Sequence, residues 1–476
     1  MSKKALLLLF TLLPTVLSAQ GGFRSTYDSF MLGARAEYND NSKNLREVWD
    51  KFKLSEGLVR VKKPKRDSLQ WVEDDNRQTG KQLRVSEVKR IVEYQWPETT
   101  DTGFRWRSRG SDTTQFRCIV FVFYGESQEI LIPARLGSFH PKGISEGEVA
   151  DFWQELSRLD LSRIISEVEI RRSYLGYNDW AILEWVQSLS HAVFPKEKHS
   201  ECVVFSVYLL NQVGLMTRMA RVQDRLILLF AAIQPVFGRK YVVLDTYPFY
   251  LADSDLKEEE VFTYANESVW KTRPLDLRLK HFPFPGTDSY RSIQKRSTIF
   301  GRTMILPINM AAMSFYSRYP QLEAREYILA QQDPLFLDAL SAEITPVIAV
   351  MEDIASINMV LSFLQKDFDY KVDVEQFGNE KPFFPEENFI YAFNDCEDRS
   401  ILFSFLAKHL LHKKVVLLEY EDHIASAILL NENLKGDYVK IGAERYYVCD
   451  PSFMNAKVGM TIPEYRNRPA KVWILE

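Results

Sequence analysis

The sequence has little histidine and no excess of charge of one sign. Its seven histidines are scattered along 476 residues, so we predict neither a metal site nor a bound cofactor. Sixty basic residues stand against 64 acidic ones, which leaves a net charge of −4. Nucleic-acid-binding proteins carry a basic face, so this balance argues against nucleic acid as a partner.

Long apolar runs are also missing beyond the first residues. No later run reaches the roughly 20 apolar residues of a membrane span, so no integral membrane segment is expected there. Residues 1–19 are typical of a secretory signal, because Lys3 and Lys4 precede an apolar run and the small pair Ser18-Ala19 ends the segment. We expect cleavage after Ala19 and export to the periplasm or the extracellular space.

Cysteine is scarce as well, with four residues at Cys118, Cys202, Cys396 and Cys449. An exported chain could join them in two disulfides. Their wide and irregular spacing favours at least one free thiol instead. The remaining cysteines then fit the role of buried packing residues.

The hydrophobic content of 46% is sufficient for a large core, and the length favours two or three domains. Apolar residues at helical spacing predict an amphipathic helix region over 20–60, and the charged stretch 61–104 has the pattern of an irregular linker. Alternating strand and helix signals fill 105–255 and 290–476, with a connection at 256–289.

The two large segments have matching features, which indicates an internal duplication. From Pro133 to Asp179 is 46 residues, and from Pro307 to Asp353 is also 46. The strand signal before Asp245 matches the one before Asp450. A polar, proline-containing insertion of about 20 residues, 370–388, precedes Cys396 in the second segment.

Three residues of the second segment form a candidate catalytic site. Cys396 is placed in the first turn of a predicted helix, where the helix dipole stabilises a thiolate. His423 stands at the start of a strand and could take the thiol proton, while Asp450 ends the next strand and could orient the imidazole. Asp395, Glu397 and Asp398 oppose thiolate formation by their charge.

Three motifs resemble those of the transglutaminase-like superfamily, a papain-related fold. They are Asn394-Asp-Cys396-Glu-Asp-Arg-Ser, Asp422-His423-Ile-Ala-Ser-Ala and Cys449-Asp450-Pro451-Ser. The resemblance covers about residues 380–460 and implies Cys396, His423 and Asp450 as a catalytic triad. It differs from the family pattern in the Ile424 that precedes Ala425 and in lacking the aromatic residue that often follows the histidine. The fold it implies is α+β, with two tandem transglutaminase-like (papain-like) units that each pack helices on an antiparallel sheet.

The first segment resembles the same family with a degenerate site. Cys202 and Asp245 are assigned to the outer positions of the triad, but Arg225 stands where His423 stands in the second segment. Arginine remains protonated near neutral pH and cannot act as a base. We therefore expect the first segment to be inactive.

The sequence leaves three functions open. The first is an exported cysteine hydrolase that acts on amide bonds of a peptide or protein substrate, with an oxyanion site formed by the Cys396 backbone N–H and, as a candidate second donor, Asn394. The second is a non-catalytic binding or scaffold protein built from two degenerate modules. The third is a protein transamidase.

Overall fold

The structure is a computed structural model that describes residues 70–71, 80–89, 115–141, 143–194, 198–244, 247–253, 261–264, 272–284 and 289–475. All of these belong to the unit formed by Lys65–Glu476. The predicted signal at 1–19, the predicted helix region at 20–60 and Asp245 lie outside the described residues. Below, residues 115–284 are called the N-terminal half and residues 289–475 the C-terminal half.

The described α-helices are α3 (Glu146–Ser157), α4 (Ser162–Ser173), α5 (Asp179–Val193), α6 (His199–Gln212), α7 (Met310–Tyr316), α8 (Ala324–Leu329), α9 (Pro334–Ile348), α10 (Asp353–Lys366), α11 (Asp373–Gln376) and α12 (Cys396–His409). Two short 3-10 helices are η2 (Pro385–Phe389) and η3 (Tyr465–Asn467).

The strands of the N-terminal half are β3 (Phe116–Phe123), β4 (Glu126–Pro133), β5 (Thr217–Val222), β6 (Arg225–Ala231), β7 (Tyr241–Leu244), β8 (Tyr247–Leu251) and β9 (Phe262–Thr263). Those before and within the C-terminal half are β1 (Gln70–Trp71), β2 (Val85–Lys89), β10 (Tyr290–Ser297), β11 (Arg302–Asn309), β12 (Asp369–Tyr370), β13 (Phe393–Asn394), β14 (Val415–Glu419), β15 (Ile424–Leu429), β16 (Tyr438–Ile441), β17 (Glu444–Cys449), β18 (Phe453–Met454) and β19 (Ala470–Ile474).

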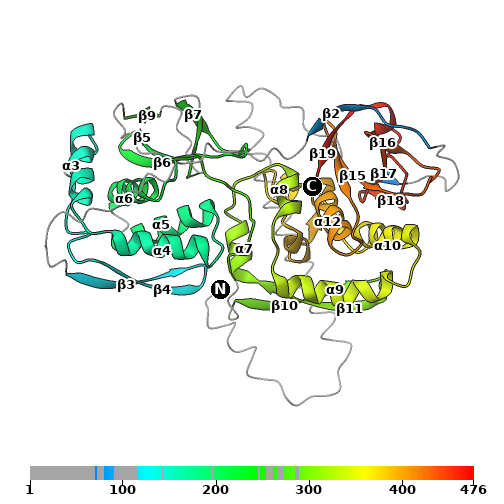
Figure 1. Cartoon of the computed structure of the whole chain (residues 1–476), viewed down its shortest axis with the longest axis horizontal. Coiled ribbons are helices and arrows are strands. Elements are labelled where there is room, and N and C mark those ends of the chain that lie inside the picture. Colours follow the sequence, from blue (N-terminus) through cyan, green and yellow to red (C-terminus); the bar gives the residue numbers. More distant parts are fainter. Residues whose placement is uncertain are drawn as a thin grey trace, which may run out of the picture. The chain divides into compact units, whose positions relative to one another are not determined.

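The two halves are built from layers in the same order. In each, helices lie between a two-stranded antiparallel hairpin and a larger sheet (Figure 1). The hairpins are β3–β4 and β10–β11. Asp179 and Asp353, which end the two matched intervals, are the first residues of α5 and α10. Helices packed on antiparallel sheets make the chain an α+β protein.

The larger sheets share a strand order. The N-terminal sheet runs β7-β8-β6-β5-β9 and the C-terminal one β16-β17-β15-β14-β19-β2. By position, β7 corresponds to β16 and β8 to β17. The sequence match between the segments before Asp245 and Asp450 therefore pairs β7 with β17, strands that hold different places, because tyrosine and valine recur in neighbouring strands of both sheets.

Part of the predicted linker 61–104 belongs to the C-terminal sheet instead. Strand β2 pairs in parallel with β19, and β1 pairs with β18. The sequence of β2, Val-Ser-Glu-Val-Lys, is short and polar because β2 forms an edge of the sheet. Likewise, β9 and the buried Leu275, Leu277 and Leu279 show that the predicted connection 256–289 packs into the N-terminal half.

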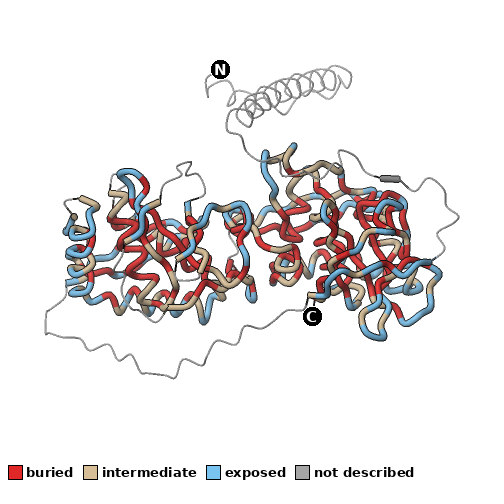
Figure 2. Tube along the Cα trace, turned by 90° about the horizontal axis from the view of Figure 1, so that it is seen from above, coloured by how far each residue is buried: buried red, intermediate tan, exposed pale blue. Residues whose placement is uncertain are grey.

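Buried residues lie in the interior of both halves, and exposed residues lie mostly on the outside (Figure 2). Along β14 the buried residues alternate, with Val415 and Leu417 in the cluster that contains α12 and Val416 and Leu418 in a second cluster on the other face. A sheet buried on both faces needs apolar residues at consecutive positions, which explains the unbroken Val-Val-Leu-Leu run. The sheet thus holds its strand ends, which carry the candidate site, on a rigid base.

All four cysteines are free. Cys449 is fully buried, as predicted from strand alternation, and Cys118 is exposed. Within the part of the chain that the structure describes, the helices are too short or too polar to traverse a lipid bilayer.

Candidate functional site

Cys396 is the first residue of α12, as the sequence predicts. The N-cap is Asp395, whose Oδ1 accepts the backbone N–H groups of Glu397 at 2.9 Å and Asp398 at 3.2 Å. Asp398 returns the bond by accepting the Asp395 N–H, which completes a capping box. The helix therefore begins at a fixed point, with the half-buried Cys396 in its first turn.

His423 and Asp450 lie side by side at the ends of paired strands. His423 directly precedes β15, Asp450 directly follows β17, and these strands pair antiparallel. The His423 Nε2 and the Asp450 Oδ2 are 2.8 Å apart, and both residues are almost fully buried. The structure thus brings together the histidine and the acid that the sequence assigned.

The hydrogen bonds of this pair decide which nitrogen of His423 could act as a base. A carboxylate only accepts hydrogen bonds, so the proton is assigned to Nε2 and the lone pair to Nδ1. Nδ1 is buried and has no hydrogen-bond partner among the described residues. An unpaired buried ring nitrogen is costly, and it is free to take a proton from a neighbour.

Two serine contacts hold α12 against β15, the strand that His423 directly precedes. Ser400 donates to the Ile424 carbonyl at 2.9 Å, and the hydroxyls of Ser404 and Ser426 are 2.9 Å apart. The Ile424 backbone amide interacts with the Cys396 thiol. Because Ile424 directly follows His423, the thiol lies beside the main chain that carries the imidazole.

Ionisation of Cys396 is opposed by its surroundings. Burial and the nearby Asp395 raise the pKa of the thiol well above its ordinary value, although the Ile424 backbone lowers it. Burial and crowding by Asp395 and Asp373 also raise the pKa of Glu397. Glu397 and Asp450 in turn add to the charges that raise the pKa of the thiol.

Asp450 is held in its ionised form. Burial alone would raise its pKa, but His423 and the hydrogen bonds from Ser452 outweigh burial and lower it. Ser452 donates both its backbone N–H and its hydroxyl to Asp450 Oδ1, at 3.0 and 2.7 Å. The Asp-Pro-Ser motif therefore leaves Oδ2 for the histidine.

Two groups that the sequence did not indicate complete the site. The Tyr465 ring stacks on His423 with centroids 4.8 Å apart and planes at 26°. The Gln365 side chain of α10 donates to the carbonyls of Phe453 and Ala456 at 2.9 and 3.1 Å, which holds the turn after Asp450. Both come from distant parts of the chain, and no local pattern marks them.

Asn394 is buried away from the solvent. Its Nδ2 donates to Asn388 at 3.1 Å, and its Oδ1 accepts from Arg399 at 2.8 Å. These bonds commit the amide to the interior of the loop, so the geometry does not support Asn394 as an oxyanion donor. The motif residue supports the turn into α12 instead.

The assigned degenerate site is not assembled as the sequence suggested. Cys202 lies in the second turn of α6, buried, with its thiol directed at the Ser190 and Phe194 carbonyls of α5. The residue that opens α6, as Cys396 opens α12, is His199, whose Nε2 lies 3.1 Å from the Leu226 carbonyl of β6. Arg225 opens β6 and is exposed. The sequence comparison paired Cys202 with Cys396 because both are cysteines. Cys202 lies about one turn further from the start of its helix than Cys396 does.

A cleft of about 1380 Å³ reaches the chain neighbours of Cys396 and His423, although neither of these residues nor Asp450 lines it. Glu397 and Ile424, the neighbours of the thiol, line it on one side, and α5 and α6 supply Trp180, His191 and His199 on the other. Small-molecule pockets commonly measure about 300–1,000 Å³. This cleft is larger and is open to an extended chain.

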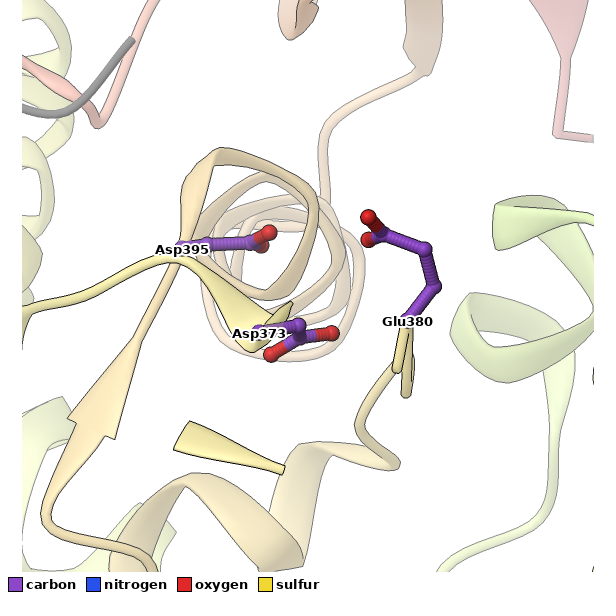
Figure 3. A group of neighbouring side chains, drawn as sticks. All are labelled: Asp373, Glu380 and Asp395. Carbon is purple, nitrogen blue, oxygen red and sulfur yellow. The ribbon is translucent and has the colours of Figure 1, made fainter. Parts of the chain in front are cut away.

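A separate group of carboxylates could hold a metal ion near the start of α12. Asp373, Glu380 and Asp395 each offer one oxygen, and these oxygens all lie within 4.8 Å of one another. Figure 3 shows the three side chains converging beside the end of the helix. The sequence predicted no metal site, because these acids are far apart along the chain and show no ligand spacing.

Models of known protein families, curated proteins and solved structures were all compared with this chain, and none of them matches.

Proposed function

We propose that the chain is an exported, transglutaminase-like cysteine hydrolase that cleaves peptide or side-chain amide bonds with Cys396, His423 and Asp450. The observation that carries the proposal is the buried His423–Asp450 pair at 2.8 Å, whose Nδ1 has no hydrogen-bond partner, together with the interaction of the Cys396 thiol with the backbone of Ile424, the residue after His423. The shared layer order and strand order of the halves support two units of one kind.

In this mechanism His423 Nδ1 takes the Cys396 proton while the sulfur attacks the amide carbonyl carbon. The imidazolium that forms is stabilised by Asp450 through the Nε2–H bond. It then gives the proton to the leaving amine as the carbon–nitrogen bond breaks, which leaves a thioester on Cys396. Water, deprotonated by His423, hydrolyses the thioester and restores the thiol.

The developing oxyanion needs donors close to Cys396. Backbone N–H groups in the first turn of a helix have no partner within the helix, so the Cys396 N–H is one candidate. A second donor is not assigned. Hydrolysis is favoured over transamidation because water needs no site of its own, whereas an amine acceptor does.

Thiol labelling tests the proposal without knowledge of the substrate. In a Cys118→Ser background, which removes the exposed thiol, iodoacetamide at pH 7 should label Cys396 selectively. The variant His423→Ala should reduce the rate by at least about tenfold, because the base that removes the thiol proton is lost. Mass spectrometry of the digested protein identifies the labelled residue.

The matched control is His412→Asn, which changes an exposed histidine whose backbone has a positive φ that asparagine tolerates. It should label at the wild-type rate. Equal labelling of Cys396 in the His423→Ala protein and its parent would contradict the catalytic role.

One observation favours the second candidate, a non-catalytic binding module. The pKa of the Cys396 thiol is raised by burial and by Asp395, opposite to the usual state of a reactive cysteine. Under this alternative, Cys396 resists labelling at pH 7 in every variant and the cleft binds a partner without turnover.

A further inference from the structure

The carboxylate group formed by Asp373, Glu380 and Asp395 joins two separate segments. Asp373 is the first residue of α11, Glu380 lies in the loop that follows, and Asp395 caps α12. One oxygen from each lies within 4.8 Å of the other two, and the side chains converge on a common centre (Figure 3). Three carboxylates this close repel one another unless a proton or a cation lies between them.

A second observation points to a bound ligand. Asp373 is only 2% exposed, and its Oδ1 is buried with no hydrogen-bond partner. Its other oxygen, Oδ2, accepts the Lys381 backbone N–H at 2.7 Å. A buried carboxylate oxygen normally has a partner, so this atom lacks one that a cation would supply.

Among the described residues, no basic side chain is paired directly with the group, and Lys381 and Arg399 act on it only as nearby charges. Across the described part of the chain, no lysine, arginine or histidine forms an ion pair within 4.0 Å of Asp373, Glu380 or Asp395. Lys381, the nearest basic residue in sequence, directs its ammonium group to Glu387. The group therefore keeps a negative charge that is open to solvent on the side of the exposed Glu380.

We propose that Asp373, Glu380 and Asp395 bind a divalent cation of the size of Ca²⁺. Calcium–oxygen distances of about 2.3–2.6 Å allow oxygens on opposite sides of the ion to be about 5 Å apart, whereas the shorter magnesium distances allow only about 4.2 Å. The oxygens, all within 4.8 Å of one another, fit inside a calcium shell. Three carboxylates on one ion suit calcium, because magnesium usually keeps several waters and takes only one or two carboxylates. Water on the open side completes the oxygen shell.

The cation fastens one wall of the cleft to the start of α12. Glu380 and Lys381 line the cleft, and Asp395 fixes the helix end through its other oxygen. Ion binding therefore holds the loop 377–382 against the helix. This inference does not depend on the catalytic proposal, because binding is measured without reference to the thiol.

The test uses the full chain after removal of metals with EDTA. Titration with CaCl2 in a calorimeter should show one site, and thermal unfolding should shift upward by several degrees with CaCl2 and less with MgCl2. The variant Asp373→Asn should bind calcium at least roughly tenfold more weakly and lose most of the shift. Without calcium it should unfold at or above the wild-type temperature, because a buried repulsive charge is removed.

Two further variants keep the result interpretable. Glu375→Gln changes an exposed acid on the same helix, α11, and should bind calcium as the wild type does. Glu380→Gln changes an exposed ligand and should weaken calcium binding without loss of folding. It replaces Asp373→Asn as the test if that variant does not fold. The proposal would be overturned if calcium did not raise the unfolding temperature of the wild type. It would also be overturned if calcium raised the unfolding temperatures of Asp373→Asn and Glu380→Gln as much as that of the wild type, whatever the result of thiol labelling.

Discussion

At the scale of single residues, the orientation of His423 is the feature that organises the site. Its ring is 4% exposed, is bonded to Asp450 on one edge and is covered by Tyr465 on one face. A histidine held in this way keeps one ring orientation, which is needed if Nδ1 is to meet the thiol. Tyr465 thus supplies an aromatic wall closer to His423 than the Tyr420 ring, whose centroid is 6.3 Å away.

Replacement of Tyr465 tests this role. In Tyr465→Leu the stacked ring is lost, so the imidazole gains rotational freedom and the rate of Cys396 labelling should fall several-fold. In Tyr465→Phe the ring remains and only the hydroxyl bond to Asp422, 2.9 Å long, is lost. The rate in this matched variant should stay within about twofold of wild type, given the modest net value of one hydrogen bond near the surface.

Both rates should be measured at a temperature well below thermal unfolding, which circular dichroism can establish for each protein. Wild-type labelling in Tyr465→Leu would show that the ring does not position His423.

At the scale of elements, close backbone contact joins the segment 80–89 to the C-terminal sheet. A Cβ added to Gly80 would lie 2.5 Å from the Gly436 carbonyl oxygen, and one added to Gly436 would lie 2.7 Å from the Gly459 Cα. Backbone atoms cannot move aside as a side chain can. These glycines therefore allow three segments to meet beside β16.

Alanine substitution separates this contact from simple backbone strain. Gly436→Ala should lower the free energy of unfolding by about 2–4 kcal/mol, because the backbone must shift to admit the methyl group. Gly442→Ala, the matched control, has φ +60° but no neighbour within 4 Å, and should cost only about 1–2 kcal/mol. Urea unfolding followed by fluorescence measures the free energy of unfolding of both variants. Equal decreases would show that the backbone near Gly436 shifts to admit the methyl group at little cost.

At the scale of the whole molecule, Glu184 links the two halves. It lies buried in α5 of the N-terminal half, and its Oε1 forms an ion pair at 2.8 Å with the Nε of Arg318, which follows α7 in the C-terminal half. The Tyr124 hydroxyl bonds its other oxygen. Burial raises the pKa of Glu184 to about 7, although Arg318, Tyr124 and Arg239 oppose the shift.

This shift predicts how stability depends on pH. A carboxyl with a higher pKa in the folded state binds more protons there than in the unfolded state, so its contribution to stability falls as pH rises from about 4.5 to about 7. Glu184→Gln removes this contribution. Between pH 4.5 and 7.5 the free energy of unfolding should decrease less for Glu184→Gln than for the wild type. The difference between the two decreases should be on the order of 1–3 kcal/mol.

Urea unfolding at both pH values provides the comparison. Parallel pH profiles for the two proteins would show that Glu184 is already ionised at the lower pH.

Local patterns were enough to predict much of the fold. The Asn178 cap of α5, the end of α6 before Gly214 and the β3–β4 hairpin are decided by neighbours in sequence. The pairing of His423 with Asp450 was also predictable, because each stands at an end of one of two strands that lie near each other in the sequence, and such strands usually lie near each other in a sheet.

What depended on distant contacts was not predictable. Three such features are the edge position of β2, the stacking of Tyr465 and the convergence of Asp373, Glu380 and Asp395. Each brings together residues that no regular spacing in the sequence connects. The match of Cys202 to Cys396 failed for a related reason, since residue type alone does not fix the turn of a helix on which a side chain lies.

By itself, then, the sequence determined where the helices and most strands form and which residues end them, because caps, turns and periodicity act over a few residues. Only the tertiary structure decided that His423 Nδ1 is unpaired, that a tyrosine covers the ring and that three acids share one space. These depend on how elements pack, and packing is set by the shape and burial of residues that are far apart in the chain.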